Sequence, residues 1–241
     1  KLEDEVRARF PEYRCARMDA DSMRARGSHE KVFEAFRSGE VQILLGTQMI
    51  AKGLDFPRVT LVGVVNADTA LHLADFRAAE RTFQLVAQVA GRTGRGERGG
   101  RVLVQTLSPD HPAIMAAARH DYRRFAREEL GIRQAAGYPP FGALVRVVLR
   151  SRQEERARLA AAELAERLRE SIRGAANPNE PVRILGPGPA PIPRLRGEHR
   201  FHLQLQAGAA ATLNELLAGA IKQFKAPDVR IAVDVDPWDM Q

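Results

Sequence analysis

The hydrophobic positions over residues 1–107 alternate between two patterns. Short, nearly continuous aliphatic runs at residues 41–45 and 59–65 are typical of strands buried on both faces of a parallel sheet. Amphipathic stretches predict helices, and shorter apolar runs predict further strands. The helices are expected at residues 2–10, 28–38 and about 77–90, and the further strands at 15–19 and 101–106. This order predicts an α/β sandwich, in which ligands gather at the carboxyl ends of the strands.

A second pattern begins after a long charged helix predicted over residues 111–130. The Pro/Gly cluster at 137–142 indicates a domain boundary. Beyond it we expect elements in the order β-α-β-β-α-β, at residues 143–150, 153–173, 182–185, 199–206, 210–224 and 229–235. This is the ferredoxin-like order, which indicates a fold and not a function. The predicted organisation is therefore an α/β domain over 1–109, a helical connector over 110–137 and a smaller α+β domain over 138–241.

Composition and charge narrow the classes of function. No apolar run approaches the roughly 18 residues of a membrane span, so no membrane partner is expected. The 37 Lys and Arg residues exceed the 30 Asp and Glu residues, and the net charge of +7 favours an anionic partner, with nucleic acid as the leading candidate. A single cysteine, Cys15, excludes disulfides and a Cys-based zinc site. The start at Lys1, with no Met or signal-peptide pattern, predicts a cytoplasmic fragment.

The sequence Gln88-Val89-Ala90-Gly91-Arg92-Thr93-Gly94-Arg95 is the most informative stretch. Its two glycines permit tight backbone geometry after a helix. Arg92 and Arg95, three residues apart, can present two guanidinium groups to one anionic target, and such a pair suits a phosphate. The alternative is a basic loop that is only solvated.

A second stretch, residues 46–57, follows a predicted buried strand. It contains a hydroxyl, an amide, an ammonium, a glycine and a carboxylate, at Thr47, Gln48, Lys52, Gly53 and Asp55. So many chemical groups in one connection favour a functional loop over a plain turn.

These stretches resemble motifs of superfamily 2 helicases. Residues 46–57 are similar to motif V, and residues 88–95 match the Q-x-x-G-R-x-G-R pattern of motif VI. The more specific resemblance is to the primosomal replication-restart DNA helicases, and it covers essentially the whole chain. It rests on motif V written as G-T-Q-M-I-A-K-G, on D-F-R-x-x-E-R at residues 75–81, and on Tyr138-Pro139-Pro140 and Asp234-Val235-Asp236-Pro237.

This resemblance implies the second RecA-like lobe and the C-terminal domain of an ATP-dependent 3′-to-5′ DNA helicase, which restarts stalled forks and loads the primosome. Arg92 and Arg95 would be the catalytic arginine fingers that stabilise the transferring γ-phosphoryl group. The nucleotide would be bound, and its state coupled to DNA, by Gln88, Gly53 and Asp55. The DNA would be contacted by Thr47 and Gln48.

The resemblance also implies what this chain does not supply. It has no G-x-x-x-x-G-K-[ST] loop and no D-E-x-H box, so ATP and Mg²⁺ would be bound mainly by an earlier lobe and the chain alone would be inactive. The family's zinc module also precedes this region, and no zinc is expected here. The implied partners are forked or single-stranded DNA, single-stranded DNA-binding protein and other primosome proteins.

A basic patch is predicted in a Pro-rich loop of the second domain. Arg194, Arg196 and Arg200, beside Phe201, suit contact with DNA phosphates, and the alternative is a structural connection. Trp238 is open to two interpretations, a base-stacking residue or the cover of a core edge. A non-enzymatic module that binds DNA or single-stranded DNA-binding protein remains an alternative function. A related RNA or recombination helicase is disfavoured by the C-terminal motifs.

Overall fold

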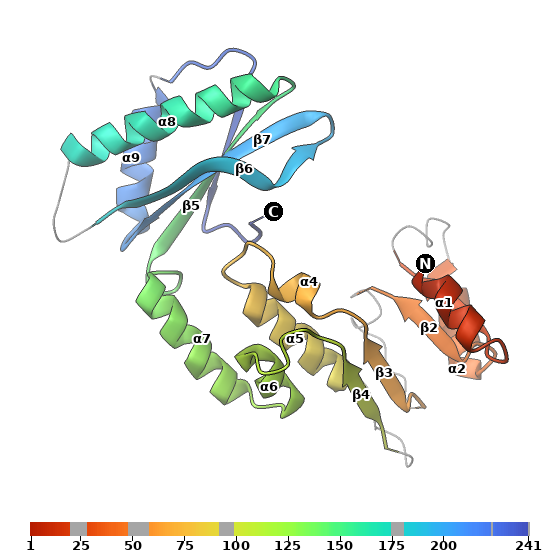
Figure 1. Cartoon of the computed structure of the whole chain (residues 1–241). Helices are drawn as coiled ribbons and strands as arrows, with labels where there is room; N and C mark the ends of the chain where they lie inside the picture. Colours follow the sequence, from red (N-terminus) through yellow and green to blue (C-terminus); the bar gives the residue numbers. More distant parts are fainter. Residues whose placement is uncertain (20–27, 48–57, 92–98, 175–180, 223, 241) are drawn as a thin grey trace. The chain divides into compact units, whose positions relative to one another are not determined.

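The computed structural model of this chain describes residues 1–19, 28–47, 58–91, 99–174, 181–222 and 224–240, and it is mixed α/β (Figure 1). The chain divides into two compact units. The first unit comprises Lys1–His72 and Ala79–Phe125, and the C-terminal unit comprises Leu73–Ala78 and Ala126–Gln241. The short segment Leu73–Ala78 therefore belongs to the C-terminal unit, although first-unit residues flank it in sequence. Among the described residues, no helix is long and apolar enough to cross a membrane.

The first unit alternates helices and strands along the chain. Its elements are α1 (Leu2–Arg9), β1 (Cys15–Met18), α2 (Ser28–Ser38), β2 (Ile43–Gly46), β3 (Leu61–Val64), α4 (Asp68–Leu71), α5 (Ala78–Ala90), β4 (Arg101–Val104) and α6 (Pro112–Ala118). Strand β1 pairs in parallel with β2, and β3 pairs in parallel with β4. The elements predicted from periodicity over this region are present, and the strands are shorter than expected.

One expectation for these strands is wrong. The aliphatic runs predict strands buried on both faces of one sheet, whereas the described strands form two separate two-stranded ladders. Val64 and Val104 pack against the helices, but Leu61 and Leu103 are exposed. In the β3–β4 ladder only one face is covered, so the aliphatic side chains of the other face remain accessible.

The core of the first unit described by the structure forms where α5 meets α6. Phe83 and Val86 of α5 are buried with Ile114 of α6 and with Phe125. The rings of Phe83 and Phe125 stack with centroids 4.4 Å apart and an interplanar angle of 5°. This packing determines which face of α5 is buried, namely the face that carries Phe83 and Val86.

The single helix predicted over residues 111–130 is two helices, α6 and α7 (Tyr122–Ala136). The break falls at His120, whose φ of 52° is left-handed and interrupts a right-handed helix. Asp121 then starts the next helix, because its Oδ1 accepts a hydrogen bond from the Arg124 backbone N–H at 2.9 Å.

The C-terminal unit contains the predicted β-α-β-β-α-β order of elements. They are β5 (Ala143–Ser151), α8 (Glu154–Gly174), β6 (Arg183–Leu195), β7 (Glu198–Ala207), α9 (Ala210–Lys222) and β8 (Arg230–Val235). The four strands form one antiparallel sheet in the order β6-β7-β5-β8, so β5 is an inner strand and β6 and β8 are the edges.

Alternating side chains of β5 point to opposite faces of this sheet. Val145, Val147 and Leu149 face α8 and α9 and join a buried apolar cluster with both helices. In Figure 1, α8 spans one face of the sheet. The C-terminal unit therefore has a hydrophobic core of its own.

The Pro-rich stretch expected to be a loop is part of strand β6. Proline is tolerated there because β6 is an edge strand, in which an N–H that points away from β7 has no neighbouring strand to bond. The pairing with β7 is irregular between Leu185 and Gly188 and between Pro189 and Arg194. A two-residue turn, Arg196-Gly197, joins the strands, and both residues have the positive φ that such hairpin turns require.

The two faces of α8 supply a matched test of this core. Leu164 is fully buried and Leu159 is 53% exposed on the same helix. We expect Leu164→Ala to lower the free energy of unfolding by about 2–5 kcal/mol, because it leaves a cavity. Leu159→Ala should change it by less than about 0.5 kcal/mol. Urea unfolding followed by circular dichroism measures both values, and equal losses would contradict the assigned buried face.

Candidate functional site

Helix α5 leads directly into the predicted arginine pair. It is amphipathic, with Phe83 and Val86 on its buried face, and Gln88 lies half-buried in its last turn. The backbone N–H of Gly91 donates to the Ala87 carbonyl oxygen at 3.0 Å, which continues the helical pattern past Ala90. Arg92 and Arg95 lie outside the described residues, so their predicted roles stay predictions.

Thr47 is exposed immediately after β2, at the carboxyl end of that strand. Gln48, Gly53 and Asp55 lie outside the described residues, so their predicted roles stay predictions. No group of three or more His, Cys, Asp or Glu side chains that could hold a metal ion occurs in the part of the chain that the structure describes.

Asp68 joins the carboxyl ends of the parallel strands β3 and β4. Its carboxylate accepts hydrogen bonds from the Thr106 hydroxyl and the Leu107 backbone N–H, both at 2.9 Å. The bond from Leu107 lowers the pKa of the Asp68 carboxyl, and the hydroxyl of Thr106 and His72 add to this effect. Asp68 is therefore ionised at neutral pH and links the start of α4 to the segment after β4.

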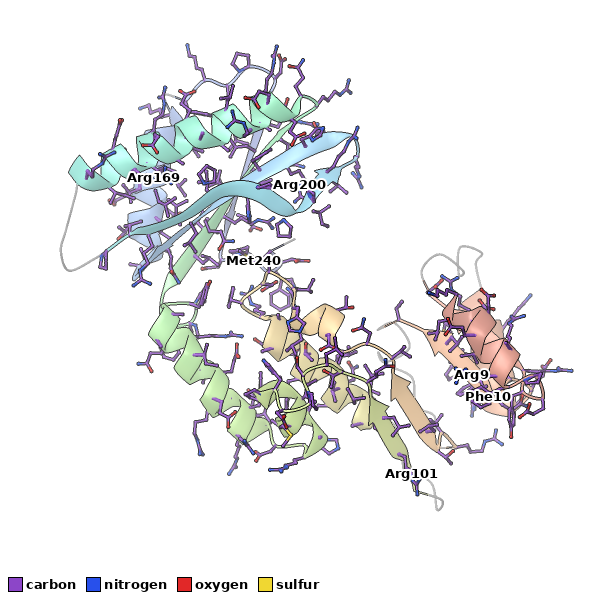
Figure 2. All side chains as sticks on the ribbon, in the orientation of Figure 1. Arg9, Phe10, Arg101, Arg169, Arg200 and Met240 are labelled. Atoms are coloured by element: carbon purple, nitrogen blue, oxygen red, sulfur yellow. The ribbon has the colours of Figure 1, made fainter. Side chains whose placement is uncertain are left out.

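Asp75 connects the turn before α5 to the chain's C-terminal residues within the C-terminal unit. Its Oδ1 accepts a hydrogen bond from the Arg77 backbone N–H at 2.9 Å, and its Oδ2 accepts one from the Met240 backbone N–H at 3.3 Å. Figure 2 shows Met240 beside this turn. The Asp75 carbonyl oxygen accepts from the backbone N–H of Ala78, the first residue of α5. The buried Asp75 thus binds both the turn before α5 and the segment that contains Met240.

Phe76 and Arg77 extend this contact. The ring of Phe76 stacks on Tyr138 with centroids 5.0 Å apart and an interplanar angle of 6°. The Arg77 Cζ lies 4.3 Å from the Phe76 ring centroid and 5.8 Å from that of Trp238, and its guanidinium donates to the Pro237 carbonyl oxygen. Trp238 itself is 83% exposed, so it does not cover a core edge.

The predicted basic patch lies on the β6–β7 hairpin. Arg194 ends β6 and Arg196 is in the turn, and both side chains are exposed. Arg200 lies on β7 and is buried at 8% exposure, as labelled in Figure 2, and its guanidinium donates to the Ile192 carbonyl oxygen at 3.3 Å. The geometry therefore favours Arg194 and Arg196 over Arg200 for contact with a phosphate.

The sheet face opposite the helices carries charged side chains close to one another. Arg146 on β5 is 2% exposed and donates to the Asp239 carbonyl oxygen at 3.3 Å. Burial lowers the pKa of Arg146, and the charge of Arg200 lowers it further. Burial also lowers the pKa of His202 to about 4, with contributions from both arginines, so this imidazole is neutral at pH 7.

Sequence reasoning used residues 75–81 only as a family motif and missed that Asp75, Phe76 and Arg77 form a contact with the C-terminal residues. A signal was present in the run Asp75-Phe76-Arg77 before a predicted helix, since Asp is favoured near helix starts. The partners Pro237 and Met240 are too far away in sequence for any local pattern to identify them.

Two family models match the chain, in sequence order. Residues 1–97 match the helicase conserved C-terminal domain, and residues 134–238 match the primosomal protein N C-terminal domain. Among solved structures, a de novo designed protein, Foldit4, is 16% identical, covers 41% of this chain and 99% of its own, and has a TM-score of 0.29. A likeness this low has no bearing on the fold.

Curated relatives align along nearly the whole chain. The replication restart protein PriA of Bacillus subtilis (strain 168) is 40% identical over 100% of this chain and 30% of its own length. Those of Treponema pallidum (strain Nichols) and Haemophilus influenzae are 41% and 38% identical, over 98% and 100% of this chain and 35% and 32% of theirs. The chain thus spans about a third of the length of these relatives. With both family models matched in order and such relatives aligned along its length, the chain is similar to a part of the replication restart protein PriA.

Proposed function

We propose that this chain is part of an ATP-dependent DNA helicase that restarts stalled replication forks and loads the primosome. The observation that carries the proposal is the order of the two matches, a helicase C-terminal domain followed by a primosomal protein N C-terminal domain. Relatives named replication restart protein PriA support it over the chain's full length. Translocation in the 3′-to-5′ direction is proposed from the family resemblance alone.

In the proposed mechanism, Arg92 and Arg95 act as arginine fingers. Charge that develops on the transferring γ-phosphoryl group is stabilised by guanidinium groups held at its oxygens. The phosphate-binding loop and the Mg²⁺ ligands belong to another lobe, because this chain has neither motif. The position of Gln88 in the last turn of α5, just before Gly91, supports a role in coupling nucleotide to this helix.

The loop after β2 is proposed to couple nucleotide to DNA. Gly53 and Asp55 would lie between the nucleotide and the strand, and Thr47 and Gln48 would bind the DNA backbone. The exposure of Thr47 at the carboxyl end of β2 supports this role, since its hydroxyl is accessible to a phosphate.

The C-terminal unit is proposed to be a ferredoxin-like domain that binds DNA. Its β-α-β-β-α-β order and its β6-β7-β5-β8 antiparallel sheet support that fold. Arg194 and Arg196 are the proposed phosphate contacts, because both are exposed on the hairpin. We retain the buried Arg200 as a residue that supports the hairpin through Ile192.

A second candidate function is a non-enzymatic module that binds DNA or single-stranded DNA-binding protein. It is favoured by one observation: the C-terminal unit has its own apolar core. This module would bind its partner without nucleotide. Single-stranded DNA-binding protein and other primosome proteins are the proposed protein partners in either case.

We expect this chain alone to hydrolyse ATP only at the background rate, with or without single-stranded DNA. Without a phosphate loop and Mg²⁺ ligands, it loses a positioning contribution of roughly 7–11 kcal/mol to the barrier. A steady-state phosphate-release assay measures this rate, with the intact protein as the positive control. Robust turnover by the purified chain would contradict the proposed division of the ATPase site.

In the intact protein, we expect Arg95→Ala to lower ATP turnover by about 10³- to 10⁵-fold while DNA affinity stays nearly unchanged. Arg101→Ala is the matched control, because Arg101 is an exposed arginine on β4 with no proposed role. Steady-state kinetics and fluorescence anisotropy with labelled DNA measure the two effects. Parental turnover combined with lost DNA binding would make Arg95 a DNA ligand instead.

We expect the double variant Arg194→Gln/Arg196→Gln of this chain to bind single-stranded DNA with a weaker salt dependence. The log–log slope should flatten by about 1.4, at about 0.7 per lost phosphate contact. Gln is chosen because it adds no backbone strain at the positive φ of Arg196. The control, Arg158→Gln/Arg167→Gln, removes the same charge from α8, where both arginines pair with Glu. If both variants give the same slope, the hairpin has no specific role.

A further inference from the structure

A row of arginines crosses three strands of the C-terminal sheet. Arg150 of β5 lies directly opposite Arg200 of β7 on one side and directly opposite Arg230 of β8 on the other. Residues paired in this way share one face of the sheet, with their Cβ atoms about 4.5–5.5 Å apart. The row lies on the face opposite α8 and α9, because one sequence neighbour of each arginine packs into the apolar core with those helices. Three positive charges are therefore placed next to one another on one face.

This row is unfavourable for the stability of the fold. Like charges directly opposite one another in a sheet are destabilising. Burial lowers the pKa of Arg200, labelled in Figure 2, and the charge of Arg150 lowers it further. The Nε of Arg150 is buried and has no hydrogen-bond partner among the residues that the structure describes. A buried donor without an acceptor is also unfavourable. An anion that accepts hydrogen bonds from this row relieves both penalties.

One carboxylate of the chain shows where negative charge is stabilised. Glu198 is the first residue of β7, and the guanidinium of Arg230 donates a hydrogen bond to its Oε1. This bond lowers the pKa of Glu198, and the charges of Arg150 and Arg152 lower it further. One carboxylate thus faces three arginines, so positive charge remains in excess around it.

An open pocket of about 630 Å³ lies at this carboxylate, with Arg152, Glu198 and Arg230 in its lining. Arg152 is exposed, and the side chain of Arg230 is 73% exposed, so both guanidinium groups are accessible from solvent. A second carboxylate of the lining, Asp228, is paired with Arg156 and does not neutralise these arginines. The pocket therefore offers a compact anion both room and unneutralised charge.

We propose that this pocket is a phosphate site, in which Arg150, Arg152 and Arg230 bind the phosphate oxygens. The planar guanidinium group matches the geometry of phosphate and binds it bidentately. Arg200 contributes charge, since its guanidinium already donates to the Ile192 carbonyl oxygen. Glu198 is an internal competitor, because its carboxylate occupies a donor of Arg230. The site depends neither on ATP hydrolysis nor on the hairpin arginines proposed above to bind DNA, because it uses none of their residues.

The first test is the melting temperature of the chain, with inorganic phosphate compared against chloride at equal ionic strength. Leu164→Ala identifies the transition of the C-terminal unit, because Leu164 is buried in its core. We expect phosphate to raise this transition in the parental chain, since a ligand that binds the folded state stabilises it. Arg150→Gln should raise it by about 1–4 °C without phosphate, by relieving the repulsion within the row, and should abolish the further rise with phosphate. A purely structural role for Arg150 would instead lower the transition in the variant.

Calorimetric titration with inorganic phosphate then tests the assigned roles. Arg152→Gln and Arg230→Gln change exposed side chains, so both should fold, and each should weaken the affinity by about three- to tenfold. Glu198→Gln should tighten it by at least about threefold, because it removes the competing charge. The control, Arg158→Gln, removes one charge that is paired with Glu155 on α8 and should leave the affinity unchanged.

Fluorescence anisotropy with labelled single-stranded DNA distinguishes the two sources of a phosphate group. If Arg150→Gln weakens the affinity for DNA as well as for phosphate, the site holds a phosphate of nucleic acid. If only the affinity for phosphate falls, the site holds free phosphate or a small phosphorylated molecule. The proposal is overturned if phosphate does not stabilise the parental chain, or if it stabilises Arg150→Gln equally.

Discussion

The architecture of the C-terminal unit depends on strand β5, which is buried on both faces. One face supplies Val145, Val147 and Leu149 to the core beneath α8 and α9. The other face carries Arg146, which is only 2% exposed. A buried guanidinium is costly unless hydrogen-bond acceptors reach it. The chain meets part of this requirement by bringing the residues after β8 across the face opposite the helices, where the Asp239 carbonyl oxygen accepts a hydrogen bond from Nη1 of Arg146.

The path of those last residues then determines what they contact next. Pro237 and Met240 are buried, and their backbone groups bind Arg77 and Asp75. A segment within the region matched by the helicase C-terminal model thereby becomes part of the C-terminal unit. The boundary between family models along the sequence and the boundary between compact units in space differ for this reason.

The arginines of the C-terminal unit differ in how far their side chains are exposed to solvent. Arg194 and Arg196 on the β6–β7 hairpin are exposed to solvent and accessible to an anion, whereas Arg146 on β5 and Arg200 on β7 are buried. The neighbouring His202 responds to both burial and charge by staying neutral at pH 7. All four residues are arginines, so the residue type does not show which of them can reach an anion. Their burial in the folded structure does show it.

The sequence by itself determined the elements and the family. Helical and strand periodicity predicted most of the helices and strands, including the β-α-β-β-α-β order, because the pattern that specifies an element lies within that element. The motif residues identified the family, although the structure does not describe several of them. Local sequence patterns did not predict the features that depend on contacts between distant elements. The Pro-rich run became an edge strand because β7 pairs with it, and the aliphatic run of β3 stayed half-exposed because only one of its faces is covered.

Only the tertiary structure decided the burial of Arg200 and the contact between Asp75 and Met240. Asp75 and Met240 are separated by 165 positions in sequence, and their pairing depends on how the chain after β8 crosses the sheet. No short-range pattern contains that information. Such contacts are set by the burial of whole faces, which requires that distant elements have already packed.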